Sequence, residues 1–241
     1  MSEPGSALPP ASSPSAPNQS APSASAPSPG PTAAAPEELA ARLASKLCHD
    51  FISPAGAIVS GLDLLEDPAA KDMRDEAMDL ITSSARKLVD QLAFARVAFG
   101  AAPGAAMFDC AELARLTGGI FAHVRADLDW AVTPISLPKA PAQVLVNLAQ
   151  LAANALPLGG MARMEVAQGP EGYQVVAFAR GPKARLAAEV QTGLAGGPLG
   201  DGLGGRWVQA YYIHALTAAA HGRIEACAED ELVTLKAIIP G

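Results

Sequence analysis

Residues 47–54, LCHDFISP, place a histidine beside an acidic residue. The imidazole of a histidine such as His49 is a nucleophile that can form a covalent intermediate, for example a labile phosphohistidine suited to onward transfer. Such transfer depends mainly on positioning and charge neutralisation. Asp50 could accept the imidazole proton during attack, and Lys46 and Ser53, one helical turn to either side, could contact phosphoryl oxygens. Lys46 and Asp50 are equally consistent with ordinary solvated side chains.

An apolar stripe on the same segment predicts where His49 points. The stripe recurs at helical spacing through Leu39, Leu43, Leu47, Phe51, Ile58, Leu62 and Leu65. At about 100° per residue, these positions fall within roughly −80° to +60° of Leu47, whereas His49 falls near 200°. A buried structural histidine is therefore not expected, and the alternative to a functional His49 is an inert surface residue.

The residues around His49 predict a surface that another molecule can approach. Small side chains surround it, Ile52 adds an exposed apolar group, and Gly56 occupies a helix interior, where glycine costs about 1 kcal/mol relative to alanine. Pro54 removes a backbone hydrogen bond and predicts a bend just past the histidine. We expect a partner protein to dock here through Arg42, Ser45, Ile52, Gly56 and Ser60. The alternative is that Gly56 and Pro54 only shape the helix bundle.

The elements that must carry this face form a helical hairpin. One helix is predicted over 36–67, with Pro36 at its first position, and EDPA at 66–69 breaks the chain before a second helix over 70–99. Helices of this length, each about 45 Å long, form an antiparallel pair with a single apolar seam. Pairing two hairpins into a four-helix bundle buries both seams. We therefore predict a homodimer through 37–99, unless the C-terminal half covers the seam within one chain.

The chain divides into three predicted parts. Residues 1–36 contain thirty Pro, Ala, Ser or Gly residues and one charged side chain, Glu3, which predicts a disordered tail. Residues 37–100 form the hairpin domain for dimerisation and phosphotransfer. Residues 108–241 form an α+β domain with a mixed sheet and helices on one face. Its helices are expected at 109–125, 141–156, 183–194 and 205–220, and its strands at 129–133, 161–168, 173–180, 223–229 and 232–239.

Composition excludes several classes of function. A net charge of −7 and scattered basic residues argue against nucleic-acid binding. The three cysteines and four histidines show no metal-ligand spacing, which favours a reduced, cytoplasmic protein with no metal of its own. Neither a signal peptide nor a stretch long enough to span a membrane is expected.

The segment from His49 to Pro54 resembles the H-box of dimeric histidine kinases, which is a histidine, an acid, two mostly apolar residues, a small polar residue and proline. Together with AGAIVSGLDLLED at 55–67, it resembles the ChpT-type histidine phosphotransferases of alphaproteobacterial cell-cycle phosphorelays. The resemblance runs from about residue 40 to the C-terminus. It implies a hairpin that dimerises into a four-helix bundle, followed by an α+β sandwich shaped like the ATP-binding domain of histidine kinases.

The same resemblance predicts that this second domain has lost its nucleotide chemistry. A working kinase has an Asn-rich helix that holds Mg²⁺, an Asp-x-Gly turn that binds the adenine amine, and a glycine-rich loop for phosphate. Here Asn154 remains, but Gln150 aligns with the other asparagine. The turn reads Ala, Arg, Gly at 179–181, so the carboxylate that would accept the adenine hydrogen bond is missing. GDGLGG at 200–205 still resembles the loop.

The resulting hypothesis is phosphotransfer without kinase activity and without a cofactor bound by this chain. His49 would take a phosphoryl group from the aspartate of one receiver domain and pass it to another, and the receivers would supply Mg²⁺. The resemblance implies a donor receiver on a CckA-like hybrid histidine kinase and acceptors like CtrA and CpdR. Two alternatives are an ATP-dependent histidine kinase with an atypical nucleotide site and a non-catalytic adaptor that binds receivers.

Overall fold

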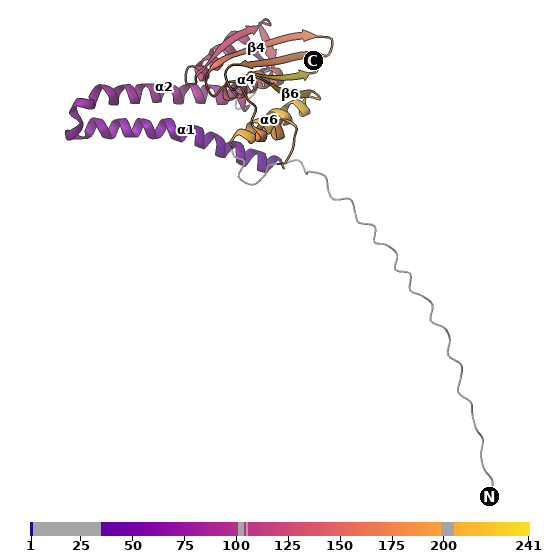
Figure 1. The fold of residues 1–241 in the computed structure, drawn as a ribbon, viewed down its shortest axis with the longest axis horizontal. Coiled ribbons are helices and arrows are strands. Elements are labelled where there is room, and N and C mark those ends of the chain that lie inside the picture. The colour runs from indigo at the N-terminus through magenta and orange to yellow at the C-terminus, as the bar shows by residue number, and fades with distance from the viewer. Residues whose placement is uncertain (2–34, 101–103, 105, 199–204) are drawn as a thin grey trace. The chain divides into compact units, whose positions relative to one another are not determined.

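A computed structural model describes residues 1, 35–100, 104, 106–198 and 205–241. The long helical hairpin is its first feature (Figure 1). Helix α1 runs over Pro36–Glu66, with Glu37 and Glu38 complementing the helix dipole in its first turn. The predicted tail and the glycine-rich loop of residues 200–205 lie almost wholly outside the described residues.

The connection between the two long helices differs from the prediction. A short 3₁₀ helix, η1, covers Pro68–Met73, and helix α2 begins only at Arg74 and ends at Ala98. Asp67 caps η1 by accepting a 2.8 Å hydrogen bond from the Ala69 backbone N–H. The backbone of Ala70, with φ −104° and ψ 28°, is not helical. The predicted start of the second helix at residue 70 was therefore wrong by four residues.

The two helices approach closely at Gly61, which is buried in α1. A Cβ atom at this position would lie 2.6 Å from Cγ1 of Ile81 and 3.1 Å from the Ala77 carbonyl oxygen. Pro54 is also buried, and α1 continues through it without interruption. The apolar side of α1 thus faces α2, as the periodicity predicted.

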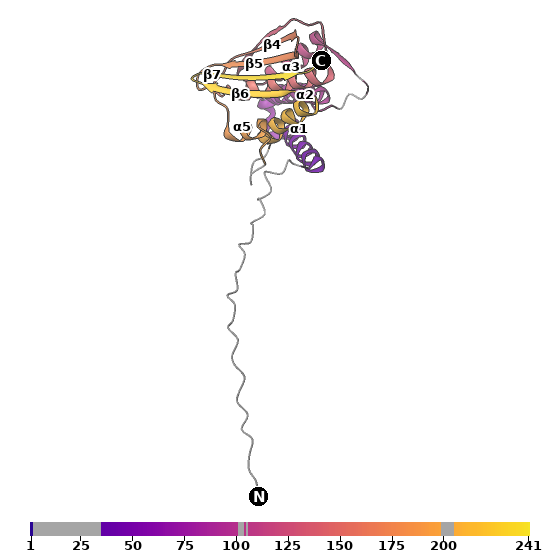
Figure 2. The same cartoon turned by 90° about the vertical axis from the view of Figure 1, so that its right-hand side faces the viewer.

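The C-terminal half is a mixed sheet with strand order β2-β4-β5-β7-β6, covered by helices on one face (Figure 2). Only β2 and β4 are parallel, and the other neighbours are antiparallel. The strands are β2 Ala126–Val132, β4 Gly160–Gly169, β5 Gly172–Arg180, β6 Arg223–Glu229 and β7 Leu232–Ile239. The helices are α3 Cys110–Phe121, α4 Lys139–Asn154, α5 Ala188–Leu194 and α6 Gly205–Ala219. This arrangement confirms the predicted mixed sheet with helices on one face.

Two local predictions in this half need correction. Strand β1, Met107–Asp109, was not predicted and overlaps the expected start of a helix at residue 109; it pairs with β3, Ser136–Pro138, which was not predicted either. The helix predicted from residue 183 begins at Ala188. Both short strands escaped prediction because three residues show no periodicity, and their pairing joins segments about thirty residues apart.

Helix α4 forms the centre of the core and is buried along most of its length, including Val144, Leu145 and Leu148. Facing it, β7 alternates buried and partly buried residues, as expected for a strand with one covered face. Helix α4 therefore has a fixed position between the sheet and the end of α2.

From residue 35 onward the described residues belong to one compact unit, in which α1 packs on α6, and α2 packs on α3 and α4. Leu39 and Leu43 of α1 pack against Trp207, Val208 and Tyr211 of α6. These two leucines were predicted to belong to the bundle seam, so at this end the chain's own C-terminal half covers the seam. No helix in the described part of the chain is long and apolar enough to cross a membrane.

Candidate functional site

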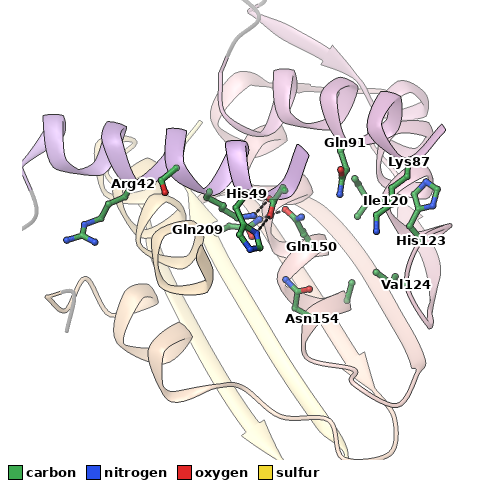
Figure 3. Close-up of a pocket in the computed structure, with 14 residues that line it drawn as sticks. Arg42, His49, Lys87, Gln91, Ile120, His123, Val124, Gln150, Asn154 and Gln209 are labelled. Carbon is green, nitrogen blue, oxygen red and sulfur yellow. Dashed lines mark hydrogen bonds and ion pairs between the residues drawn. The ribbon is translucent and has the colours of Figure 1, made fainter. Parts of the chain in front are cut away.

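Helix α1 carries His49 on its open side (Figure 3). The side chain is 87% exposed, which confirms the outward direction predicted from the apolar stripe. The ring has no hydrogen bond to any described residue, and Oδ1 of Asp50 lies 3.8 Å from its Nδ1. The imidazole is therefore held only loosely on the protein side and is open to a partner.

Lys46 and Asp50 are less exposed than their neighbour. The Lys46 ammonium donates to Oδ2 of Asp50, and the side chains are only 9% and 29% exposed respectively. The sequence suggested that Lys46 could contact phosphoryl oxygens or be an ordinary solvated lysine. The structure instead engages its ammonium with the neighbouring carboxylate, and the two oxygens of Asp50 face two different partners.

The predicted docking residues lie mostly in the open. Ile52 is 70% exposed, and Ser45, Ser53, Gly56 and Ser60 are also exposed. A Cβ atom added to Gly56 would meet nothing within 4 Å, so packing within this chain does not require glycine there. Arg42 is the exception in the group, because its guanidinium donates to Oε1 of Glu38 at 2.7 and 3.0 Å.

A cleft of about 660 Å³ opens beside His49, between the hairpin and the α+β half (Figure 3). The hairpin lines it with Lys46, His49, Lys87 and Gln91, and the other half lines it with His123, Gln150 and Asn154. Lys87 forms no ion pair among the described residues. Oε1 of Gln91 is buried without a hydrogen-bond partner among them.

Sequence reasoning missed the contact that joins the two walls of this cleft. Nε2 of His123, which follows α3, lies 2.9 Å from Oδ2 of Asp90 on α2. Gly119 leaves room for that carboxylate, because a Cβ atom there would lie 3.1 Å from Cγ of Asp90. The partners are 33 residues apart, and neither stands in a recognisable motif, so no local signal could have paired them.

Buried amides on α4 join the same two parts of the molecule. Nδ2 of Asn147 donates to the Ala98 carbonyl oxygen at 2.9 Å, and Nε2 of Gln143 donates to the Val97 carbonyl oxygen at 3.2 Å. These carbonyls belong to the last turn of α2, where the regular helical hydrogen bonds end, and the Val97 carbonyl also accepts from the Gly100 N–H at 3.3 Å. Nε2 of Gln209 completes the network by donating to Oδ1 of Asn147 and Oε1 of Gln150. The α4 amides thus hold the end of the hairpin.

The turn at 179–181, aligned with the kinase Asp-x-Gly turn, is tightly packed. Gly181 is required there because a Cβ atom would lie 2.5 Å from the Gly159 carbonyl oxygen. Beyond the turn, the Arg185 N–H donates to the Ala155 carbonyl oxygen at 3.0 Å. A pocket of about 70 Å³ lies between α4 and the segment that includes Leu186 and Val190.

Metal binding has no evident site in the parts of the chain described. No three His, Cys, Asp or Glu side chains there cluster closely enough to hold an ion.

Comparison with known proteins identifies the family. A family model described as the histidine phosphotransferase C-terminal domain matches residues 110–232. The protein phosphotransferase ChpT of Brucella abortus (strain 2308) is 32% identical over 203 residues, which covers 83% of this chain and 96% of the relative. This chain belongs to the ChpT histidine phosphotransferase family. A bacterial phosphotransferase solved at 1.7 Å superposes with a TM-score of 0.77 at 30% identity, covering 86% of this chain and 98% of that one. Membership in the ChpT family makes the chain a protein phosphotransferase of two-component phosphorelays.

Proposed function

We propose that this ChpT-family protein relays phosphoryl groups between receiver domains through Nε2 of His49. The observation that carries the proposal is the 87% exposed imidazole, with Asp50 on its Nδ1 side and no protein group bound at Nε2 in the described part of the chain. A nucleophile without internal partners is free to meet a bulky reactant such as a domain surface. The exposed residues around His49 have small side chains that do not obstruct such a surface, namely Ser45, Ser53, Gly56 and Ser60. Ile52 offers an apolar contact.

The relay has two steps. In the first, Nε2 attacks the phosphorus of a receiver's aspartyl phosphate; the P–O bond breaks, the aspartate carboxylate leaves, and a P–N bond forms. The ring keeps its proton on Nδ1 and becomes cationic, so the Asp50 carboxylate is placed to stabilise it. In the second step, the aspartate of another receiver attacks phosphorus, and neutral His49 leaves. Ser53 is the residue of this chain best placed by helical spacing to contact phosphoryl oxygens.

The receivers supply the remaining chemistry. Aspartyl phosphate sites in receivers would bring Mg²⁺ and their own acidic residues, and this chain would bring no cofactor. The family suggests a CckA-like hybrid histidine kinase as donor and CtrA-like and CpdR-like response regulators as acceptors, in a cell-cycle phosphorelay. The docking residues are Arg42, Ser45, Ile52, Gly56 and Ser60.

ATP is not the phosphate source in this proposal. The turn at 179–181 supports this, because it has no carboxylate to accept a hydrogen bond from the adenine amine. The commitment of Asn147 and Gln143 to the end of α2 supports it further, since a kinase must move its nucleotide domain to reach the histidine. Here that movement would break buried hydrogen bonds.

The protein acts as a homodimer in this proposal. Five large apolar side chains of the hairpin are 45–64% exposed, namely Val59, Leu62, Met78, Val89 and Leu92. On α2, the positions of Met78, Val89 and Leu92 fall within about 60° of one another around the helix. Burying such a stripe against a second copy would form the four-helix bundle expected of paired hairpins. A Leu92→Glu variant should be monomeric by light scattering, and an unchanged dimer mass would exclude this interface.

The decisive test of function is transfer from a purified receiver carrying ³²P on its aspartate. Wild-type protein should become labelled in the presence of Mg²⁺ and then lose label to a second receiver. The His49→Ala variant should take up no label while keeping its fold by circular dichroism. Labelling that persists in this variant would show that His49 is not the carrier.

Two further outcomes separate the alternatives. Self-labelling from γ-³²P-ATP would make the protein a kinase with an atypical nucleotide site. Receiver binding without any labelling of the wild-type protein would make it an adaptor.

A further inference from the structure

We infer that Lys46 is a positioning residue for phosphotransfer, which holds the Asp50 carboxylate so that its second oxygen faces Nδ1 of His49. The inference rests on the proposed function of His49. Lys46 would touch neither the receiver nor the phosphoryl group. It would act through Asp50 on the orientation and tautomer of the nucleophile.

The geometry of the three residues supports this arrangement. Lys46 and Asp50 are four residues apart and therefore neighbours on the surface of α1, and His49 lies between them in sequence. Oδ2 of Asp50 accepts the hydrogen bond from Lys46 Nζ, and Oδ1 lies 3.8 Å from Nδ1 of His49. The carboxylate thus bridges an ammonium and an imidazole. At 3.8 Å the second contact is not yet a hydrogen bond, and such contacts often shorten only when the reactants are bound.

The burial of Lys46 is the second observation. A lysine on a helix surface normally extends its ammonium into water, yet this side chain is only 9% exposed. Helix stability does not explain the cost of burying it, because a lysine N-terminal to its acidic partner is the less favourable order for such a pair. A fixed carboxylate beside His49 is the evident gain from this arrangement.

The fixed carboxylate selects one form of the neutral imidazole. A proton on Nδ1 would face Asp50, which leaves the lone pair on Nε2, the exposed nitrogen that must attack phosphorus. Histidine tautomers are set in this way wherever one ring nitrogen has a fixed acceptor. Without Lys46, the Asp50 side chain would rotate freely, and the tautomer that cannot attack through Nε2 would gain population.

The other charged groups of the cleft provide a matched control. Lys87 lines the same cleft from α2 but forms no ion pair with Asp50 or any other described residue. A Lys87→Met change removes the same charge from the same cleft as Lys46→Met. An effect common to both variants would come from the loss of positive charge in the cleft. An effect confined to Lys46→Met would come from the loss of the contact between Lys46 and Asp50.

The first measurement uses the unphosphorylated full-length protein labelled with ¹⁵N. Long-range ¹H–¹⁵N spectra distinguish the two neutral tautomers of each histidine, and His49→Ala identifies the His49 signals. Wild type and Lys87→Met should both show mainly the Nδ1–H form of His49. Lys46→Met should shift the population toward the Nε2–H form, and Lys46→Arg should restore it.

The second measurement is the initial rate of labelling from a phosphorylated receiver at varied receiver concentration. Lys46→Met should lower kcat about tenfold, a small part of what proton positioning can contribute, and leave KM unchanged. Lys46→Arg should recover most of the rate, and Lys71→Met, on η1, should match wild type.

A fall in kcat with an unchanged tautomer population would overturn the inference, because Lys46 would then act on the phosphoryl group directly. Wild-type rate and tautomer in Lys46→Met would also overturn it. Failure of wild-type protein to label at all would refute the proposed function instead, and the tautomer spectra, which need no phosphate, would still decide whether Lys46 orients His49.

Discussion

Helices α1 and α4 both carry polar side chains that the structure places at defined partners or surfaces, but they use them in opposite ways. On α1, His49 is exposed and makes no hydrogen bond to the described residues. On α4, Gln143 and Asn147 are buried and bonded to carbonyl oxygens at the end of α2. A polar group without internal partners is available to another molecule, whereas a buried and satisfied group holds structure together. Helix α1 therefore exposes a nucleophile to other molecules, whereas α4 fixes the C-terminal half against the end of α2.

The largest expected effect tests whether the buried amides of α4 stabilise the protein, by comparing substitutions of Asn147 and Asn154. Asn147→Leu removes the donor to the Ala98 carbonyl and the acceptor for Gln209, and should lower the free energy of unfolding by about 1–3 kcal/mol. Urea titration followed by circular dichroism measures the change.

The control is Asn154→Leu on the same helix, where the side chain is exposed and makes no hydrogen bond to the described residues. This variant should stay within about 0.5 kcal/mol of wild type. Equal losses in the two variants would mean that the buried amide network does not stabilise the junction.

Two glycines of α1 sharpen the contrast between its covered and open sides. Gly61→Ala places a methyl group 2.6 Å from Ile81 and should cost about 1–3 kcal/mol. Gly56→Ala places one in open space and should instead raise stability by about 0.5–1 kcal/mol, because alanine is the better helix former.

The proposed docking face predicts a second effect of the Gly56→Ala substitution, on receiver binding. Gly56→Ala should weaken receiver binding in titration calorimetry although it stabilises the free protein. Unchanged receiver affinity in this variant would remove Gly56 from the docking face.

The smallest effect concerns the cysteines. Burial raises the pKa of the Cys110 thiol above its ordinary value, with a further contribution from the charge of Asp109, so little thiolate forms near neutral pH. Cys48, beside His49, and Cys227 are exposed. Iodoacetamide at pH 8 should modify these two first, as peptide mass mapping would show. Early modification of Cys110 would mean that the start of α3 opens more readily than its packing indicates.

Much of the fold could be predicted from local pattern. Periods of 3.6 and 2 residues located the hairpin and the five strands of the main sheet, because a side chain's face follows directly from its position in a regular element. The same rule predicted that His49 points outward. Errors fell on short elements, such as the strands at 107–109 and 136–138, whose existence depends on pairing with a distant segment.

The sequence by itself therefore determined the hairpin, the five strands of the main sheet and the direction in which the nucleophile faces. Only the tertiary structure decided what surrounds it: the burial of Lys46, the pairing of Asp90 with His123, and the capping of α2 by amides of α4. The last two contacts join residues 33 and 49 positions apart. The physical reason is that helical and strand periodicity is a property of neighbouring residues, whereas burial and long-range hydrogen bonds exist only once separate elements pack together.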